Sequence, residues 1–72
     1  MKISYDPEVD AMYIQLIEGH HECRTIRLSD EVALDIGPDE QLVGVEILDA
    51  KEILGLESPA TIKLENVLTR AS

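Results

Sequence analysis

Apolar and polar residues alternate along much of the chain, and this pattern predicts about five short β-strands. The expected strands cover residues 2–5, 11–17, 23–28, 32–36 and 42–48, because each run is rich in aliphatic residues and is bounded by turn residues. The connections DPEVD, SDE and GPDE are short and polar. Short loops between successive strands make an antiparallel β-meander the simplest topology.

The two faces of this predicted sheet differ in composition. The face expected to form the core carries every second residue of the strands, with Val43, Val45 and Ile47 at its centre. The opposite face is more apolar than a freely solvated sheet face usually is, and its exposed apolar area would be covered by an oligomer contact. The interface residues predicted on it are Tyr13, Ile17, Leu42, Gly44 and Leu48.

After the last strand the period changes from that of a strand to that of a helix. Asp49 is a suitable N-cap, Ile53 and Leu54 follow at helical spacing, and Gly55 ends the helix. The fold class is therefore a small two-layer α+β protein, with one short helix packed on a face of the meander. Residues 1–57 are expected to form one compact domain, and residues 58–72 a tail, either a strand or a helix packed on a partner subunit.

The composition limits how large a core the chain can build. It has 72 residues, no Phe or Trp, and only Tyr5 and Tyr13 as aromatic residues. A domain of this size lies near the lower limit at which one hydrophobic core outweighs the lost conformational entropy. A thin aliphatic core favours assembly into a homo-oligomer.

The charge and the apolar runs narrow the classes of partner and the compartment. Six Lys and Arg residues against fifteen Asp and Glu residues give a net charge of −9, which repels nucleic acid and permits a basic protein partner. No apolar run reaches the roughly 18 residues of a membrane span. The single cysteine, Cys23, fits a reducing compartment, so we expect a cytoplasmic protein.

Three segments resemble one small prokaryotic family, catalogued as domain of unknown function 2283. They are YDPEVDAMYI at residues 5–14, VALDI at 32–36 and VGVEILDA at 43–50, and the resemblance covers roughly residues 1–54. It implies a compact sheet with a C-terminal helix and no established reaction. By analogy it also suggests an antitoxin-like role beside a small basic protein. The connection EGHHEC differs from the family pattern and is not carried over.

Two clusters invite a metal interpretation, and neither has complete ligand spacing. His20 and His21 are weak candidates because adjacent side chains in an extended segment point apart, and no second ligand pair follows elsewhere. Asp6 opens an acidic loop like that of a calcium site, but the sixth position is Ala11 and the twelfth is Ile17. The sequence therefore predicts no metal, cofactor or catalytic residue.

Two function hypotheses remain after these exclusions. The first is a non-enzymatic interaction module that acts as a homo-oligomer. The alternative is a small-ligand or metal-binding enzyme whose site forms between subunits from His20, His21, Asp35 and Glu46. Cross-strand pairs between these acids and Arg24 or Arg27 are a further structural expectation.

Overall fold

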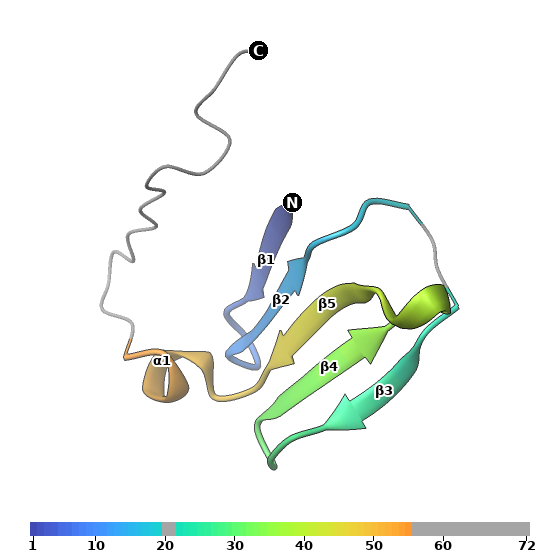
Figure 1. Ribbon diagram of the computed structural model, residues 1–72. Helices are drawn as coiled ribbons and strands as arrows, with labels where there is room; N and C mark the ends of the chain where they lie inside the picture. Colours follow the sequence, from blue (N-terminus) through green and yellow to red (C-terminus); the bar gives the residue numbers. More distant parts are fainter. Residues whose placement is uncertain (20–21, 56–72) are drawn as a thin grey trace.

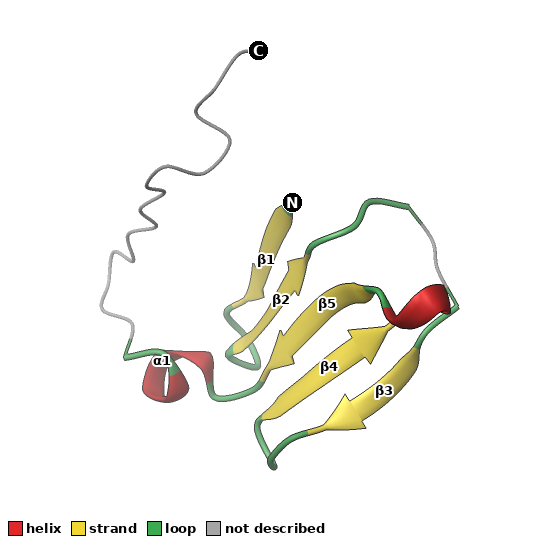
Figure 2. Ribbon diagram, in the orientation of Figure 1, coloured by secondary structure: helices red, strands yellow, loops and turns green. Residues whose placement is uncertain are grey.

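The computed structural model describes residues 1–19 and 22–55 of the chain. These residues form one antiparallel sheet with short helical segments beside it (Figures 1 and 2). In chain order the elements are β1 (Lys2–Asp6), β2 (Ala11–Gln15), β3 (Arg24–Arg27), β4 (Val32–Ile36), the 3-10 turn η1 (Pro38–Glu40), β5 (Leu42–Ile47) and α1 (Ala50–Ile53).

The strands are arranged in the order β1-β2-β5-β4-β3, and every neighbouring pair is antiparallel. This confirms the predicted fold class, a small α+β protein with a five-stranded antiparallel sheet and a short helix after its last strand. The order differs from the consecutive order of a meander. The strand that follows β2 in the chain, β3, lies at the far edge of the sheet. β4 pairs with β3, and β5 then lies between β4 and β2 (Figure 1).

The register assigns each strand residue to one of two faces, since residues directly opposite each other point to the same side. Ile14 lies opposite Ile3 and Val45, and Leu34 lies opposite Val45 and Ile26. We call this side the apolar face; it consists of Ile3, Tyr5, Met12, Ile14, Arg24, Ile26, Val32, Leu34, Ile36, Val45 and Ile47, while Leu42 and Val43 lie at the register shift between β4 and β5. We call the other side the polar face; it consists of Lys2, Ser4, Asp6, Ala11, Tyr13, Gln15, Thr25, Arg27, Ala33, Asp35, Gly44 and Glu46.

The core is as thin as the composition predicts. The buried apolar residues among those described are Ala33, Val43, Ile47 and Ala50, and no large side chain is fully buried. Ile14 and Val45, at the centre of the apolar face, are only half-buried. In the described part of the chain, much of the apolar face of the sheet is therefore accessible to water.

The helix α1 is held by a residue from the opposite end of the chain. Asp49 occupies the predicted N-cap position, but its backbone is left-handed and its side chain makes no capping hydrogen bond. Instead the Ala50 amide donates to the Asp10 carbonyl at 3.0 Å, and the Lys51 amide donates to the Asp10 carboxylate at 3.2 Å. The Tyr5 hydroxyl also donates to that carboxylate, at 2.6 Å. Asp10 thus caps the helix and ties it to the β1–β2 hairpin.

The helix is short and lies at the end of β5, beside the β1–β2 turn (Figure 1). Ala50 is fully buried, whereas Ile53 and Leu54 remain 43% exposed. No helix in residues 1–19 and 22–55 is long and apolar enough to cross a membrane. The predicted tail, residues 58–72, lies outside the described part of the chain.

Candidate functional site

A cluster of polar side chains lies at the middle of the polar face and is centred on Asp35 of β4. Thr25 of β3 donates a hydrogen bond to the Asp35 carboxylate at 2.9 Å. Tyr13 of β2 and Glu46 of β5 lie beside Asp35 on the same face. Four strands therefore contribute one residue each to this group, which we call the Asp35 cluster. It lines a shallow depression whose margin includes Lys2, Gln15 and Cys23.

Gly44 allows Tyr13 to reach Asp35. The two residues lie on β2 and β4, with β5 between them, so the tyrosine ring must pass over β5. A Cβ atom at Gly44 would lie 2.1 Å from the Tyr13 hydroxyl oxygen and 2.4 Å from Cζ, which means that the ring occupies that space. A glycine inside a strand often marks such a close approach.

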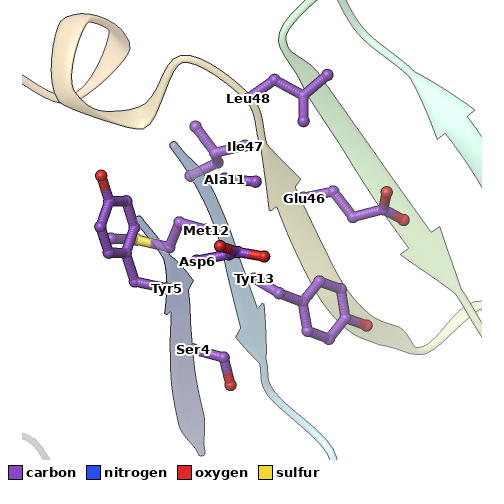
Figure 3. A pocket seen from close by; sticks show the side chains of 9 residues that line it. All are labelled: Ser4, Tyr5, Asp6, Ala11, Met12, Tyr13, Glu46, Ile47 and Leu48. Carbon is purple, nitrogen blue, oxygen red and sulfur yellow. The ribbon is translucent and has the colours of Figure 1, made fainter. Parts of the chain in front are cut away.

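A second depression lies next to the Asp35 cluster, between the ends of β1, β2 and β5 (Figure 3). It is wide open and mostly apolar. Figure 3 shows Tyr13 and Glu46 projecting from neighbouring strands, in agreement with their opposed positions in the register. Leu48 lies at the upper end of the same depression. Of the predicted interface residues, Tyr13 and Leu48 are thus brought to one hollow.

The remaining predicted interface residues do not join them in a single patch. Gly44 is covered by the Tyr13 ring. A register shift between Asp35 and Ile36 sets Leu42 opposite Ile36, at the other end of β5 from Leu48. Ile17 is half-buried beyond the end of β2. The interface at these five residues stays a prediction.

The Asp35 cluster changes the acidity of two of its members. The pKa of Glu46 is raised above its usual value, chiefly by the hydrogen bond with Asp35, then by desolvation and by the Asp35 charge, while Arg27 acts in the opposite direction. The pKa of Tyr13 is raised above 10.0 by desolvation, by the hydrogen bond with Asp35 and by nearby negative charge. A neighbouring negative charge disfavours ionisation of a carboxyl group, which is the direction of the change at Glu46.

The stability of the protein is expected to fall as the pH rises through the pKa of Glu46. A carboxyl group whose pKa is raised by folding binds its proton more tightly in the folded state, so its contribution is present below the unfolded pKa and is lost above the folded one. The substitution Glu46→Gln keeps a neutral hydrogen-bonding group beside Asp35 and should remove this part of the pH dependence. Urea unfolding of both proteins between pH 3 and pH 8, roughly the titration range of carboxyl groups, measures it. Parallel pH profiles would contradict the coupling.

The two arginines that were predicted to pair with Asp35 and Glu46 bind other groups. Arg24 makes an exposed salt bridge with Glu40, beside the turn that joins β4 to β5. Arg27 donates to the carbonyl oxygens of Ser29 and Asp30 at 3.4 and 3.3 Å, and so supports the β3–β4 turn. Neither arginine makes a salt bridge with Asp35 or Glu46 among the described residues. The expectation that they pair with these two acids was wrong, because closer acceptors lie in the adjoining turns.

The acidic loop after β1 serves the fold. One oxygen of the Asp6 carboxylate accepts the Glu8 amide at 2.9 Å, which closes the turn, and Asp10 caps α1. No group of three or more His, Cys, Asp or Glu side chains suited to a metal ion is found in residues 1–19 and 22–55. The weak metal candidates His20 and His21 lie outside the described residues.

Sequence reasoning brought Asp35 and Glu46 together but missed two members of the cluster. Tyr13 was predicted as an interface residue and Thr25 was not singled out, and nothing in the sequence indicated that either lies beside Asp35. The one available signal was Gly44, since a glycine in the middle of an apolar strand needs a packing reason. The large residue that fills its space comes from a strand paired through long-range contacts.

Comparison with known proteins gives one result. Residues 2–51 match the sequence model of a family that is described as protein of unknown function (DUF2283). This range agrees with the resemblance seen in the sequence at residues 1–54. A comparison with curated proteins and one with solved structures found no match.

Proposed function

The chain belongs to the DUF2283 family of proteins of unknown function, and from its geometry we propose that it is a cytoplasmic, non-enzymatic interaction module that assembles with a second copy of itself through the apolar face. The observation that supports this is the exposure of the apolar face. Ile3, Tyr5 and Ile26 are each 38% exposed, although all three share this face with the buried Ile47. Burying apolar area releases about 25 cal/mol per Å², so covering this face favours association.

A second sheet of the same kind fits this surface. Two sheets that pack face to face stand about 10 Å apart and interdigitate side chains such as Ile14, Leu34 and Val45. A two-fold axis would bring the same surface of both copies together, which is the commonest arrangement of homodimers. The result is a sandwich whose two layers come from two chains.

The polar face is a poorer surface for this contact. It carries Asp35 and Glu46, and two copies would bring four carboxyl groups into a space without water. Burying charged groups without compensating partners costs several kcal/mol. We therefore place the proposed contact on the apolar face instead of at Tyr13, Gly44 and the other residues first predicted.

A lysine at Ile26 tests the proposal. Ile26 is 38% exposed in the single chain, so the folded chain tolerates the charge, but the contact would bury it. We expect the unmodified protein to have a mass of at least twice the 8.0 kDa chain mass at tens of micromolar, and Ile26→Lys to weaken the assembly at least about tenfold, since an uncompensated buried charge costs more than 1.4 kcal/mol. Size-exclusion chromatography with light scattering measures both.

The matched control is Thr25→Lys, which adds the same charge to the other face of the same strand. Its ammonium group would stand beside Asp35 and Glu46 and leave the apolar face unchanged, so its assembly should match that of the unmodified protein. Circular dichroism shows whether each variant is folded. An unmodified protein with the mass of one chain would refute the homo-oligomer, and equal weakening by both lysines would refute the choice of face.

The acidic surface supports a further part of the proposal, a small basic protein as partner. Fifteen acidic residues against six basic ones give the assembled module a high negative charge, which attracts a basic surface and speeds its association. We expect a small basic protein encoded beside its gene to copurify with it and to dissociate at high salt, because salt screens exposed charges beyond about 8–10 Å. A mixture of the two purified proteins that shows no complex at low salt would exclude this antitoxin-like role.

A further inference from the structure

We propose that β1 is a second self-assembly site, where the edge strands of two copies pair antiparallel about Ser4 and join two five-stranded sheets into one continuous sheet. This contact uses the edge of the sheet and does not depend on the face contact proposed above. Within residues 1–19 and 22–55, β1 is an outermost strand of the sheet, and β2 is the strand to which it is hydrogen-bonded (Figure 1). A strand in this position presents a row of backbone N–H and C=O groups that can pair with another strand.

The sequence of β1, KISYD, is complementary to itself in one antiparallel register. When Ser4 lies opposite Ser4 of the second copy, Lys2 lies opposite Asp6 and Ile3 lies opposite Tyr5. Two oppositely charged pairs then form at the ends of the seam, and two aliphatic–aromatic pairs form beside its centre. Both kinds of cross-strand pair are stabilising.

This register also matches the faces and the backbone groups. Ile3 and Tyr5 both belong to the apolar face, so the pairing extends that face across the seam. Lys2, Ser4 and Asp6 all belong to the polar face. In an antiparallel strand alternate residues bond to one neighbour and then to the other. In this register each residue lies opposite one whose backbone N–H and C=O groups point to the same edge of its own strand. The groups that point outward in one copy therefore face those that point outward in the other.

The ends of β1 limit the contact to this segment. Pro7 follows the strand and has no backbone N–H to donate, so pairing stops at Asp6. The Glu8 amide occupies only one oxygen of the Asp6 carboxylate, and the second oxygen can accept from Lys2 of the other copy.

The opposite edge of the sheet is built differently. β3 has the sequence RTIR and contains no acidic residue, so two copies of it have no complementary charges to pair; Arg24 is already bound to Glu40, and Arg27 to the carbonyl oxygens of the β3–β4 turn. Two copies of β3 would bring four guanidinium groups to one seam, and like charges across strands are destabilising. A contact between β1 and β3 would join unlike edges head to tail and would not close into a dimer. The charges therefore select pairing of β1 with β1.

A disulfide tests the register. In an antiparallel pair the Cα atoms of opposed residues lie about 4.5–5.5 Å apart, which is within the range that a disulfide spans. In a Cys23→Ser background, Ser4→Cys should crosslink two copies under mild oxidation. Lys2→Cys is the control, because two copies of residue 2 would lie roughly 13 Å apart at 3.3 Å per residue. Failure of Ser4→Cys to crosslink, or equal crosslinking by both, would overturn the proposal.

Exchanged charges test the pairing of Lys2 with Asp6. Lys2→Glu leaves only acids at the ends of the seam, and Asp6→Lys leaves only bases. In each variant alone, the affinity of the edge contact should therefore fall about tenfold. A mixture of the two should restore it, because every acid then faces a base. Native mass spectrometry of the separate and mixed proteins distinguishes these outcomes. Random mixing of the two chains would refute the charge pairing.

One combination separates this proposal from the face contact. Ile26→Lys disrupts the apolar face and leaves β1 unchanged, so Ser4→Cys should still crosslink in that variant. Crosslinking there, together with a mass that Ile26→Lys does not change, would reject the face contact and keep the edge contact. If Ile26→Lys lowers the mass and Ser4→Cys forms no crosslink, the edge contact is rejected and the face contact is kept.

Discussion

Replacing Ile47 with alanine is expected to lower the free energy of unfolding by about 2–5 kcal/mol. Ile47 is 5% exposed and lies between Met12 and Val32 on the neighbouring strands. It is a large residue among the few buried ones, so the surrounding side chains cannot fill the space that it leaves. A chain of 72 residues has a total stability of about 4–11 kcal/mol at the usual 0.05–0.15 kcal/mol per residue. This single change therefore removes a large fraction of it.

Leu48→Ala is the matched control for this prediction. Leu48 follows Ile47 directly but is 44% exposed, and its truncation should cost less than about 1 kcal/mol. Urea unfolding at one fixed protein concentration compares the two variants, since an assembling protein has a concentration-dependent stability. Equal losses at the two positions would show that the strand faces are assigned wrongly.

Replacing Asp10 with alanine is expected to lower the free energy of unfolding by about 2 kcal/mol, which combines a lost helix cap with a lost hydrogen bond to a charged group. The Asp10 carboxylate accepts both the Lys51 amide and the Tyr5 hydroxyl. The pKa of Tyr5 is raised chiefly by this hydrogen bond, so it should fall towards 10.0 in the variant. Chemical unfolding and an ultraviolet titration of tyrosine measure the two effects.

Asp49→Ala provides a control with the same chemistry and nearly the same backbone. Asp10 has φ 52° and Asp49 has φ 49°, so alanine is equally strained at both positions. Asp49 makes no capping hydrogen bond, and its replacement should cost only that strain, about 1 kcal/mol. The difference between the two variants isolates the side-chain hydrogen bonds of Asp10. A larger loss of stability for Asp49→Ala would instead show that Asp49 caps the helix, as its position in the sequence suggests.

Several features of the fold follow from local patterns. Alternation along Val43, Val45 and Ile47 predicts both the strand and its buried side, and the change of period after Leu48 places the helix correctly at residue 50. The absence of Phe and Trp predicts the thin core. The motifs YDPEVDAMYI and VGVEILDA indicate the family that the comparison then shows. Each of these signals lies within a few adjacent residues, where steric preference and hydrophobic periodicity act directly.

Local patterns in the sequence predict only part of the candidate site. Alternation places Asp35 and Glu46 on one face, and this much was predicted. The path of Tyr13 over Gly44 to Asp35 depends on β2 and β4 flanking β5, which no local pattern specifies. The raised pKa of Glu46 follows from that arrangement and not from its neighbours in the chain.

By itself, the sequence determined which residues form strands, which of them point to the same side, where the helix begins and how little core the chain can bury. Only the tertiary structure decided that β5 lies at the centre of the sheet, that Asp10 and not Asp49 caps the helix, and that four strands meet at Asp35. The physical reason is the range of the interactions. Backbone preference and periodicity act between near neighbours, whereas the order of strands, and every contact that depends on it, is selected by pairing between segments far apart in the chain.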